Sequence, residues 1–171
     1  VYIIMTIYFD GAGFEAEKLC VKQFNGELLT TTDFQYKDID CVVRTKKGMQ
    51  YTASVKDQRT STKQGYTTIQ LELEQVNTTN NKNCDGCFYK NESDFYFWLV
   101  VHNNKEQWCI IKTEVLKDYV AKNKNTLKTW QTKETTEAKN RSYNRKFDRS
   151  KGVMIDIKTL TKLGEVKPLL C

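Results

Sequence analysis

The sequence predicts a single α/β domain in which a central mixed β-sheet is flanked by helices. Three patterns predict this class: a helical repeat of apolar residues near the N-terminus, an alternating segment at Tyr66–Val76, and a continuous apolar run at Phe95–Val101. These patterns are typical of a core-facing helix, a half-buried strand and a strand covered on both faces, respectively. The 171 residues fall in the size range of one domain, and a single proline leaves no proline-rich linker.

The first predicted element is a short amphipathic helix over Gly13–Phe24. Its inner face carries apolar residues at helical spacing, and Gly26 offers a C-terminal stop. Glu17 is the carboxylate on that inner face. A different helix phase turns Glu15 inward instead, so the sequence leaves both glutamates as candidates for the inner position.

A β-hairpin follows the helix. Phe34–Thr45 is predicted as its first strand, Lys46–Gly48 as the turn, and Met49–Val55 as its second strand. Asp40 lies inside the first strand and Lys56 ends the second. Charged residues at these positions are unusual, because strands of this composition pack against a core.

The rest of the chain supplies the other elements of the domain. After a polar loop over Asp57–Gly65 the expected order is the strand Tyr66–Val76, a polar loop over Asn77–Asn91, the central strand Phe95–Val101, a turn at Asn103–Asn104, the strand Gln107–Ile111, a helix with Thr113 as its N-cap, and a closing core element at Val153–Leu163.

Glu17, Asp40 and Lys56 are the candidate chemical site. Buried charges are normally paired or bound to a metal, because an isolated buried charge is costly. Mg²⁺ takes oxygen ligands, usually one or two carboxylates together with water and substrate phosphate. A lysine beside such an ion can orient or deprotonate the attacking water and stabilise developing negative charge. Each residue also has an ordinary structural explanation, such as a strand end or a surface ion pair.

Three segments resemble the PD-(D/E)XK nuclease superfamily. They are Gly13-Phe14-Glu15-Ala16-Glu17, Asp38-Ile39-Asp40-Cys41-Val42-Val43 and Ala53-Ser54-Val55-Lys56. That family has a glycine-started helix bearing a glutamate, an aspartate followed by apolar strand residues, and an acidic-X-Lys motif on the next strand. The chain is similar to the branch with Gln-X-Lys, which includes small bacterial and phage endonucleases and a homing-type endonuclease. Segments like Ser93–Trp98 and Gln107–Ile111 extend the resemblance to Val120.

The resemblance implies a restriction-endonuclease-like core and a Mg²⁺-dependent DNA endonuclease, with Mn²⁺ able to substitute. Glu17 and Asp40 are then the metal ligands, Lys56 acts on water and phosphate, and Ser54 supports the site. Ser54 departs from the family, which has Glu, Asp or Gln there; Glu72 or Glu74 is an alternative source of the missing carboxylate. A catalytically decayed DNA-binding protein, or a phage or plasmid protein that binds a host protein, are the alternative functions.

The predicted partner is double-stranded DNA. The chain carries a net charge of +6, and Lys and Arg outnumber Asp and Glu in a basic segment over 122–151 that also holds aromatic residues. Such a segment suits phosphate backbones, although a solvated lysine-rich face is the alternative interpretation. Cutting two strands suggests a homodimer or higher homo-oligomer. The candidate DNA contacts are Lys46, Lys47, Lys128, Lys139, Arg141, Arg145, Lys146 and Arg149.

The six cysteines are expected to be reduced. Several lie in apolar-patterned segments, and the start of the chain does not read as a signal peptide, so we expect an intracellular, cytoplasmic protein of a bacterial or phage-infected cell. Cys84 and Cys87 have the spacing of half a zinc site, but two thiols in a surface loop are the favoured interpretation. His102, the only histidine, is predicted to be a turn residue, which gives little support to histidine-based hydrolases.

Overall fold

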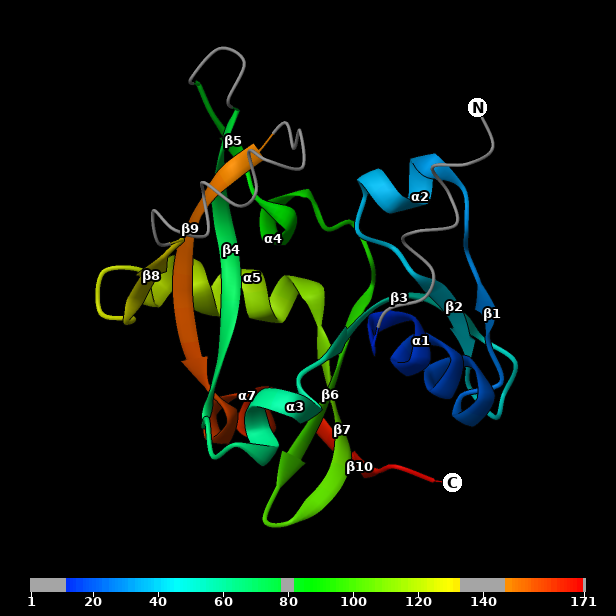
Figure 1. Ribbon diagram of the computed structural model, residues 1–171. Coiled ribbons are helices and arrows are strands. Elements are labelled where there is room, and N and C mark those ends of the chain that lie inside the picture. Colours follow the sequence, from blue (N-terminus) through cyan, green and yellow to red (C-terminus); the bar gives the residue numbers. More distant parts are fainter. Residues whose placement is uncertain (1–11, 78–81, 133–146, 171) are drawn as a thin grey trace.

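The protein has a mixed α/β architecture with a central mixed sheet flanked by helices (Figure 1). The computed structural model describes residues 12–77, 82–132 and 147–170. Its strands form two sheets, a central one of six strands and a second one of four. No helix among these residues has both the length and the apolar character needed to cross a membrane.

The central sheet carries the two strands that were expected to bear the site. Its spatial order is β1 (Glu27–Leu28), β2 (Cys41–Arg44), β3 (Gln50–Asp57), β6 (Phe95–His102), β7 (Lys105–Lys112) and β10 (Glu165–Pro168). The pair β3–β6 is parallel, and every other neighbouring pair is antiparallel. A parallel pair needs a long crossover connection, and the chain builds part of the second sheet within it.

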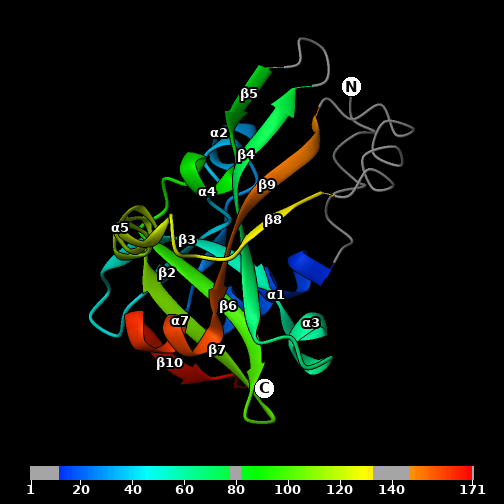
Figure 2. The same ribbon diagram turned by 90° about the vertical axis from the view of Figure 1, so that its left-hand side faces the viewer.

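The second sheet is antiparallel and has the order β5 (Lys82–Asp85), β4 (Thr68–Asn77), β9 (Phe147–Asp156) and β8 (Thr129–Gln131). Figure 2 shows these strands beside one another, with β6 and β7 continuing below them. The strand predicted over Tyr66–Val76 is therefore confirmed as β4. Its main partner is β9, which lies far along the chain, so local patterning did not reveal a separate sheet.

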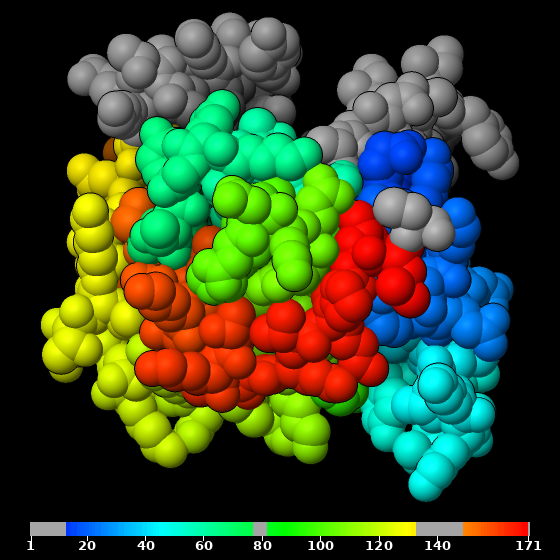
Figure 3. All heavy atoms as spheres, turned by 90° about the horizontal axis from the view of Figure 1, so that it is seen from below, coloured from blue at the N-terminus to red at the C-terminus, as the bar shows by residue number. Residues whose placement is uncertain are grey.

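In the described residues, six helices connect and cover the strands. They are α1 (Ala12–Gln23), α2 (Thr32–Tyr36), α3 (Arg59–Lys63), α4 (Cys87–Lys90), α5 (Thr113–Asn123) and α7 (Ile157–Leu163). α1 packs on β2 and β3, whereas α5 lies beside the second sheet (Figure 1). Seen from below, α7 and β10 form a continuous surface next to the β6–β7 turn (Figure 3).

Alternation along β6 divides the interior into two cores. Phe97 and Leu99 point toward α1, and Tyr96, Trp98 and Val100 point toward the second sheet and α5. All five side chains are almost completely buried. The continuous apolar run of the sequence therefore becomes a central strand with apolar neighbours on both faces, as predicted.

The strand predicted over Phe34–Thr45 is wrong in its first half. Thr32–Tyr36 forms α2, Asp38 has a left-handed backbone with φ 53°, and β2 begins only at Cys41. A residue with positive φ cannot continue an extended strand. Asp40 therefore lies immediately before β2 and not inside it.

Other boundaries also differ from the expected ones. The two polar loops contain α3, β5 and α4, and the final element is divided between β9 and α7. Lys112, not Thr113, occupies the N-cap position of α5. The Thr113 hydroxyl lies 3.2 Å from the Ser93 hydroxyl instead, which makes it part of a buried polar network.

Candidate active site

Glu17 is brought to the central sheet by the close packing of α1. Ala16 and Cys20 are fully buried against β2 and β3, and the small Ala16 side chain lets the helix approach the strands. Glu17 follows Ala16 and is half-buried. Glu15 is exposed and pairs with Lys18 at 2.9 Å. The helix phase therefore turns Glu17, and not Glu15, toward the sheet.

Asp40 is fixed at the open end of the β2–β3 hairpin by two backbone contacts. Its amide donates to the carbonyl of Ala53 at 2.9 Å, and its carboxylate oxygen Oδ2 accepts from the amide of Val55 at 2.6 Å. The carboxylate thus accepts a hydrogen bond from β3 just before the first residue of β2, where a backbone carbonyl would otherwise be the acceptor.

Lys56 lies between two aspartates. Its Nζ is 2.6 Å from Oδ1 of Asp38 and 3.9 Å from Oδ2 of Asp40. The side chains of Lys56, Asp38 and Asp40 are 28%, 17% and 20% exposed, so solvent screens these charges less than it screens surface pairs. Ser54 is fully buried on the same side of β3, and its hydroxyl donates to Oδ2 of Asp38 at 3.1 Å.

The site has an excess of negative charge. Burial, followed by the charge of Asp40, raises the pKa of Glu17 to about 7, although Lys56 opposes the shift. Burial is also the largest cause of the raised pKa of Asp40, and Asp38 adds to it. Three carboxylates face one ammonium, so the fully ionised group has a net formal charge of −2. A divalent cation is the ligand that this charge favours.

Lys56 is held in its charged form. Burial lowers its pKa, but the charges of Asp38 and Asp40 outweigh that effect and raise the pKa above the ordinary value for a lysine. The side chain is therefore an ammonium at neutral pH. In this form it can donate hydrogen bonds and offset negative charge, so the raised pKa favours this role over that of a base, the other role that the sequence suggested.

Two carboxylates of this cluster are candidate ligands for a Mg²⁺ ion. Both oxygens of Asp38 are engaged, Oδ1 by Lys56 and Oδ2 by Ser54 and Asn91. Glu17 and Asp40 remain, and Mg²⁺ commonly uses only one or two protein carboxylates beside water and phosphate. Within the described ranges no group of three or more His, Cys, Asp or Glu side chains is arranged to hold a metal ion by itself.

The candidate DNA contacts that the structure describes do not gather around this cluster. Lys46 and Lys47 are exposed at the closed tip of the β2–β3 hairpin. At about 3.3 Å per residue along β3, this tip is roughly 20 Å from Lys56, so Lys46 and Lys47 do not lie beside the site. Lys128 and Arg149 are exposed beside or on the second sheet. Four further candidates lie outside the described residues: Lys139, Arg141, Arg145 and Lys146.

The glutamates considered as substitutes for the residue at Ser54 are used elsewhere. Glu72 Oε1 accepts from the amide of Cys87 at 3.2 Å and from its thiol at 3.1 Å, and Glu74 pairs with Lys151 at 2.9 Å. Both glutamates belong to β4 of the second sheet. Neither contact brings a carboxylate to Asp40.

Cys84 and Cys87 are free thiols on either side of the β5–α4 junction. Burial and the nearby charge of Glu72 raise the pKa of Cys87 to about 12. Zinc binds the thiolate, so a raised pKa disfavours a metal at this position. The structure therefore favours the interpretation of two surface thiols. The other described cysteines, Cys20, Cys41 and Cys109, are also free.

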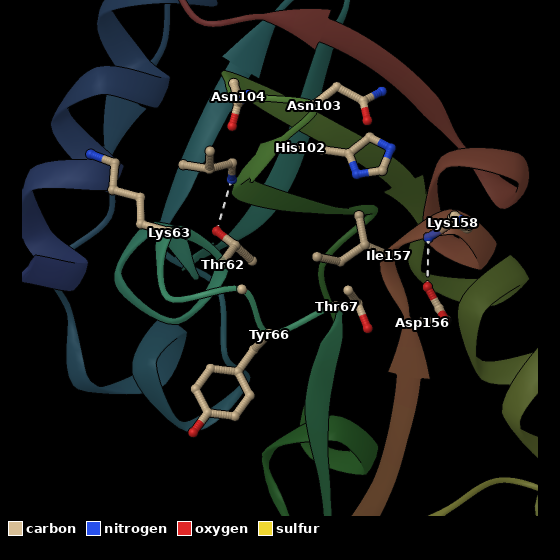
Figure 4. A pocket seen from close by; sticks show the side chains of 12 residues that line it. Thr62, Lys63, Tyr66, Thr67, His102, Asn103, Asn104, Asp156, Ile157 and Lys158 are labelled. Carbon is tan, nitrogen blue, oxygen red and sulfur yellow. Dashed lines mark hydrogen bonds between the residues drawn. The ribbon is translucent and has the colours of Figure 1, made fainter.

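The only histidine lies in a different part of the molecule. His102 is the last residue of β6 and lines a pocket of about 370 Å³ between α3, the β6–β7 turn and the start of α7 (Figure 4). In this pocket Asp156 caps α7 by accepting from the amide of Lys158 at 3.1 Å. The pocket contains none of the residues Glu17, Asp40 and Lys56.

Sequence patterning missed two residues of the site, Asp38 and Asn91. Asp38 stands two residues before Asp40, and its adjacency to the candidate aspartate was the only available signal. Asn91 is 1% exposed and donates to Asp38 from 53 positions away in the chain. The sequence predicts a polar loop at this position, and nothing local distinguishes Asn91 from other asparagines.

The charge excess predicts a measurable effect of Glu17→Gln on stability. A carboxyl group whose folded pKa exceeds its unfolded pKa destabilises the ionised folded state, and this cost grows between about pH 4.5 and 7. Without metal, we expect Glu17→Gln to match the wild type at pH 4.5 and to exceed its unfolding free energy at pH 8. The gain is on the order of 1–2 kcal/mol after solvent screening.

Urea unfolding in EDTA at the two pH values measures this gain. Glu15→Gln is the matched control, because Glu15 is exposed on the same helix and pairs with Lys18 on the surface. Equal changes in unfolding free energy between the two pH values in Glu17→Gln and Glu15→Gln would show that Glu17 is not part of a cluster with excess negative charge.

The cluster combines an acidic, half-buried pair of potential metal ligands with an ammonium that a neighbouring aspartate holds in place. Such a set can bind a hard cation and stabilise negative charge on an oxyanion beside it. A scan against protein-family models found no match for the chain, and neither did searches of curated proteins and of solved structures.

Proposed function

We propose that the protein is a metal-dependent endonuclease that hydrolyses DNA phosphodiester bonds and is built on a restriction-endonuclease-like core. The observation that carries this proposal is the shared, half-buried site of Glu17, Asp40 and Lys56 at the open end of the β2–β3 hairpin. The elements agree with the motif order of the PD-(D/E)XK superfamily. A glutamate lies on α1, an aspartate precedes an apolar strand, and Ser54 and Lys56 lie on the adjacent strand.

Each residue has a distinct role in the proposal. Glu17 and Asp40 hold Mg²⁺ through carboxylate oxygens. The bound ion supplies Lewis acidity and makes a water molecule more acidic. Lys56 stays protonated and offsets the negative charge that grows on the phosphate oxygens during hydrolysis. Ser54 and Asp38 hold Lys56 in place, so Ser54 supports the site without providing a ligand.

The proposed substrate is double-stranded DNA held by phosphate contacts away from the site. Lys128 and Arg149 are exposed along the second sheet and offer such contacts. The hairpin-tip residues Lys46 and Lys47 lie too far from Lys56 to contact the same phosphate. Cleavage of both strands suggests a homodimer, in which two copies of the site act on opposite strands.

A catalytically decayed DNA-binding protein is the second candidate function. Ser54 stands where the family has Glu, Asp or Gln, and its hydroxyl is directed to Asp38. The site therefore has one carboxylate fewer than the family pattern. In this alternative the charge cluster retains a structural role and DNA is bound without being cut.

Incubation of the purified protein with supercoiled plasmid separates the two functions. We expect nicked and linear products with Mg²⁺ or Mn²⁺ and none with EDTA, because the two carboxylates need a cation to act on phosphate. A gel shift on the same plasmid in Ca²⁺ measures binding independently. Retained binding without nicking in either metal would support the decayed protein instead.

A further inference from the structure

Asn91 connects the loop between α4 and β6 to the acidic cluster. Its Nδ2 donates to Oδ2 of Asp38 at 2.9 Å and to the main-chain carbonyl of Asp38 at 3.3 Å. The side chain is almost completely buried, so water does not replace these contacts. A single amide group thus holds both the backbone and the carboxylate of Asp38.

The orientation of this amide is fixed from its other end. Oδ1 of Asn91 accepts from the amide of Ser93 at 2.9 Å and from its hydroxyl at 2.6 Å. A flipped amide would place Nδ2 against the Ser93 amide, which is also a donor, and its oxygen against a carboxylate. The Nδ2 group therefore has to face Asp38.

The network extends into the core and to α5. The Ser93 hydroxyl lies 3.2 Å from that of Thr113, the first residue of α5, and Lys117 on the same helix donates to the main-chain carbonyl of Asn91 at 2.6 Å. Ser93 and Thr113 are both buried. A buried and mutually satisfied polar network of this kind is rigid, because breaking one bond leaves other groups unpaired.

Asp38 needs this support because its backbone is strained. A φ of 53° is uncommon for a residue other than glycine and costs on the order of 1 kcal/mol. In this conformation Oδ1 of Asp38 lies 2.6 Å from the Lys56 ammonium. The position of Lys56 therefore depends on a bond that Asn91 makes from a distant segment.

We propose that Asn91 is a positioning residue of the site: it holds Asp38 so that Asp38 fixes the Lys56 ammonium beside Asp40. The kinetic part of this inference rests on the proposed nuclease function. The structural part, the dependence of Lys56 on Asn91, does not. Within the part of the chain that the structure describes, the hydrogen bonds of Asn91 reach Asp38 but neither Lys56 nor Asp40, so the proposed effect on Lys56 passes through Asp38.

A double-mutant cycle on Asn91 and Asp38 tests this route. We expect Asn91→Ala to lower kcat for plasmid nicking in Mg²⁺ by about 10- to 100-fold, with KM within about twofold, as for other residues that orient a functional group. In an Asp38→Ala background, Asn91→Ala should lower kcat by no more than about twofold further. If the loss of kcat in the double mutant equals the product of the losses in the two single mutants, the two residues act independently and the proposal is overturned.

The Nζ–H resonance of Lys56 gives a readout that does not need activity. We expect a slowly exchanging ammonium signal in a lysine-selective ¹H–¹⁵N spectrum of the wild type, assigned by its loss in Lys56→Met. It should disappear in Asp38→Ala and in Asn91→Ala, and persist in Asn125→Ala, which changes an exposed asparagine beyond the end of α5. Persistence in Asn91→Ala would overturn the proposal.

These measurements separate the two claims. Loss of the signal in Asn91→Ala, together with a wild type that does not cut DNA, would refute the nuclease function but support the positioning role. If Asn91→Ala does not fold, Ser93→Ala removes one donor to Asn91 and should weaken the same signal. An unchanged signal in folded Ser93→Ala, with exchange as slow as in the wild type, would count against the network.

Discussion

Replacement of Lys56 with alanine is expected to lower the rate of DNA cleavage by about 10²–10³-fold, the usual loss when one group that stabilises a developing oxyanion is removed. DNA affinity should stay within about twofold, because Asp38 and Asp40 already offset the charge of the ammonium before the reaction begins. Single-turnover cleavage of a plasmid in Mg²⁺, together with a binding titration in Ca²⁺, measures the two quantities separately.

The same substitution should also reduce stability, because it leaves two half-buried carboxylates without their shared cation. Cleavage therefore has to be measured well below the melting temperature of the variant. Lys162→Ala is the matched control, since Lys162 is exposed on α7. Cleavage by folded Lys56→Ala at the rate of the control would show that the mechanism proposed for Lys56 is wrong.

Asp40→Asn is expected to have the largest effect on metal dependence. The asparagine oxygen can still accept from the amide of Val55, so the hairpin should keep its register. The charge that holds a divalent cation is lost, and we expect cleavage to fall on the order of 10³-fold. DNA affinity should be unchanged or higher, because a negative charge facing phosphate has been removed.

A thermal-shift titration with Mg²⁺ tests the metal site without DNA. Binding to the native state raises the melting temperature with ligand concentration, and we expect this rise in the wild type but a much smaller one in Asp40→Asn. Asp118→Asn, which changes an exposed residue of α5 paired with Lys122, should respond like the wild type. An equal rise in Asp40→Asn and in the control would place the bound cation elsewhere.

The two substitutions together distinguish an active nuclease from its decayed alternative. In an active enzyme both abolish most cleavage while the protein still binds DNA. In a decayed protein neither changes a measurable rate, and Lys56→Ala has only its effect on stability. The charge excess at Glu17 and Asp40 should appear in both cases, because it follows from the packing of α1 and not from catalysis.

The elements that the sequence predicted well are those with a strong local pattern. The helical repeat became α1, the alternating segment became β4, and the apolar run became β6 with β7 beside it. Their periodicity reflects which side of each element is buried, and that information is local. For the same reason the inward position of Glu17 followed from helical spacing once the structure had fixed the helix phase.

The sequence by itself determined the α/β class, the main strands and the candidate trio of Glu17, Asp40 and Lys56. Only the tertiary structure decided that Asp38 is the nearer partner of Lys56, that Asn91 holds Asp38, and that β4 pairs with β9 in a second sheet. Periodicity reports burial, whereas a hydrogen bond across 53 residues or a left-handed backbone at Asp38 depends on which distant groups the fold brings together.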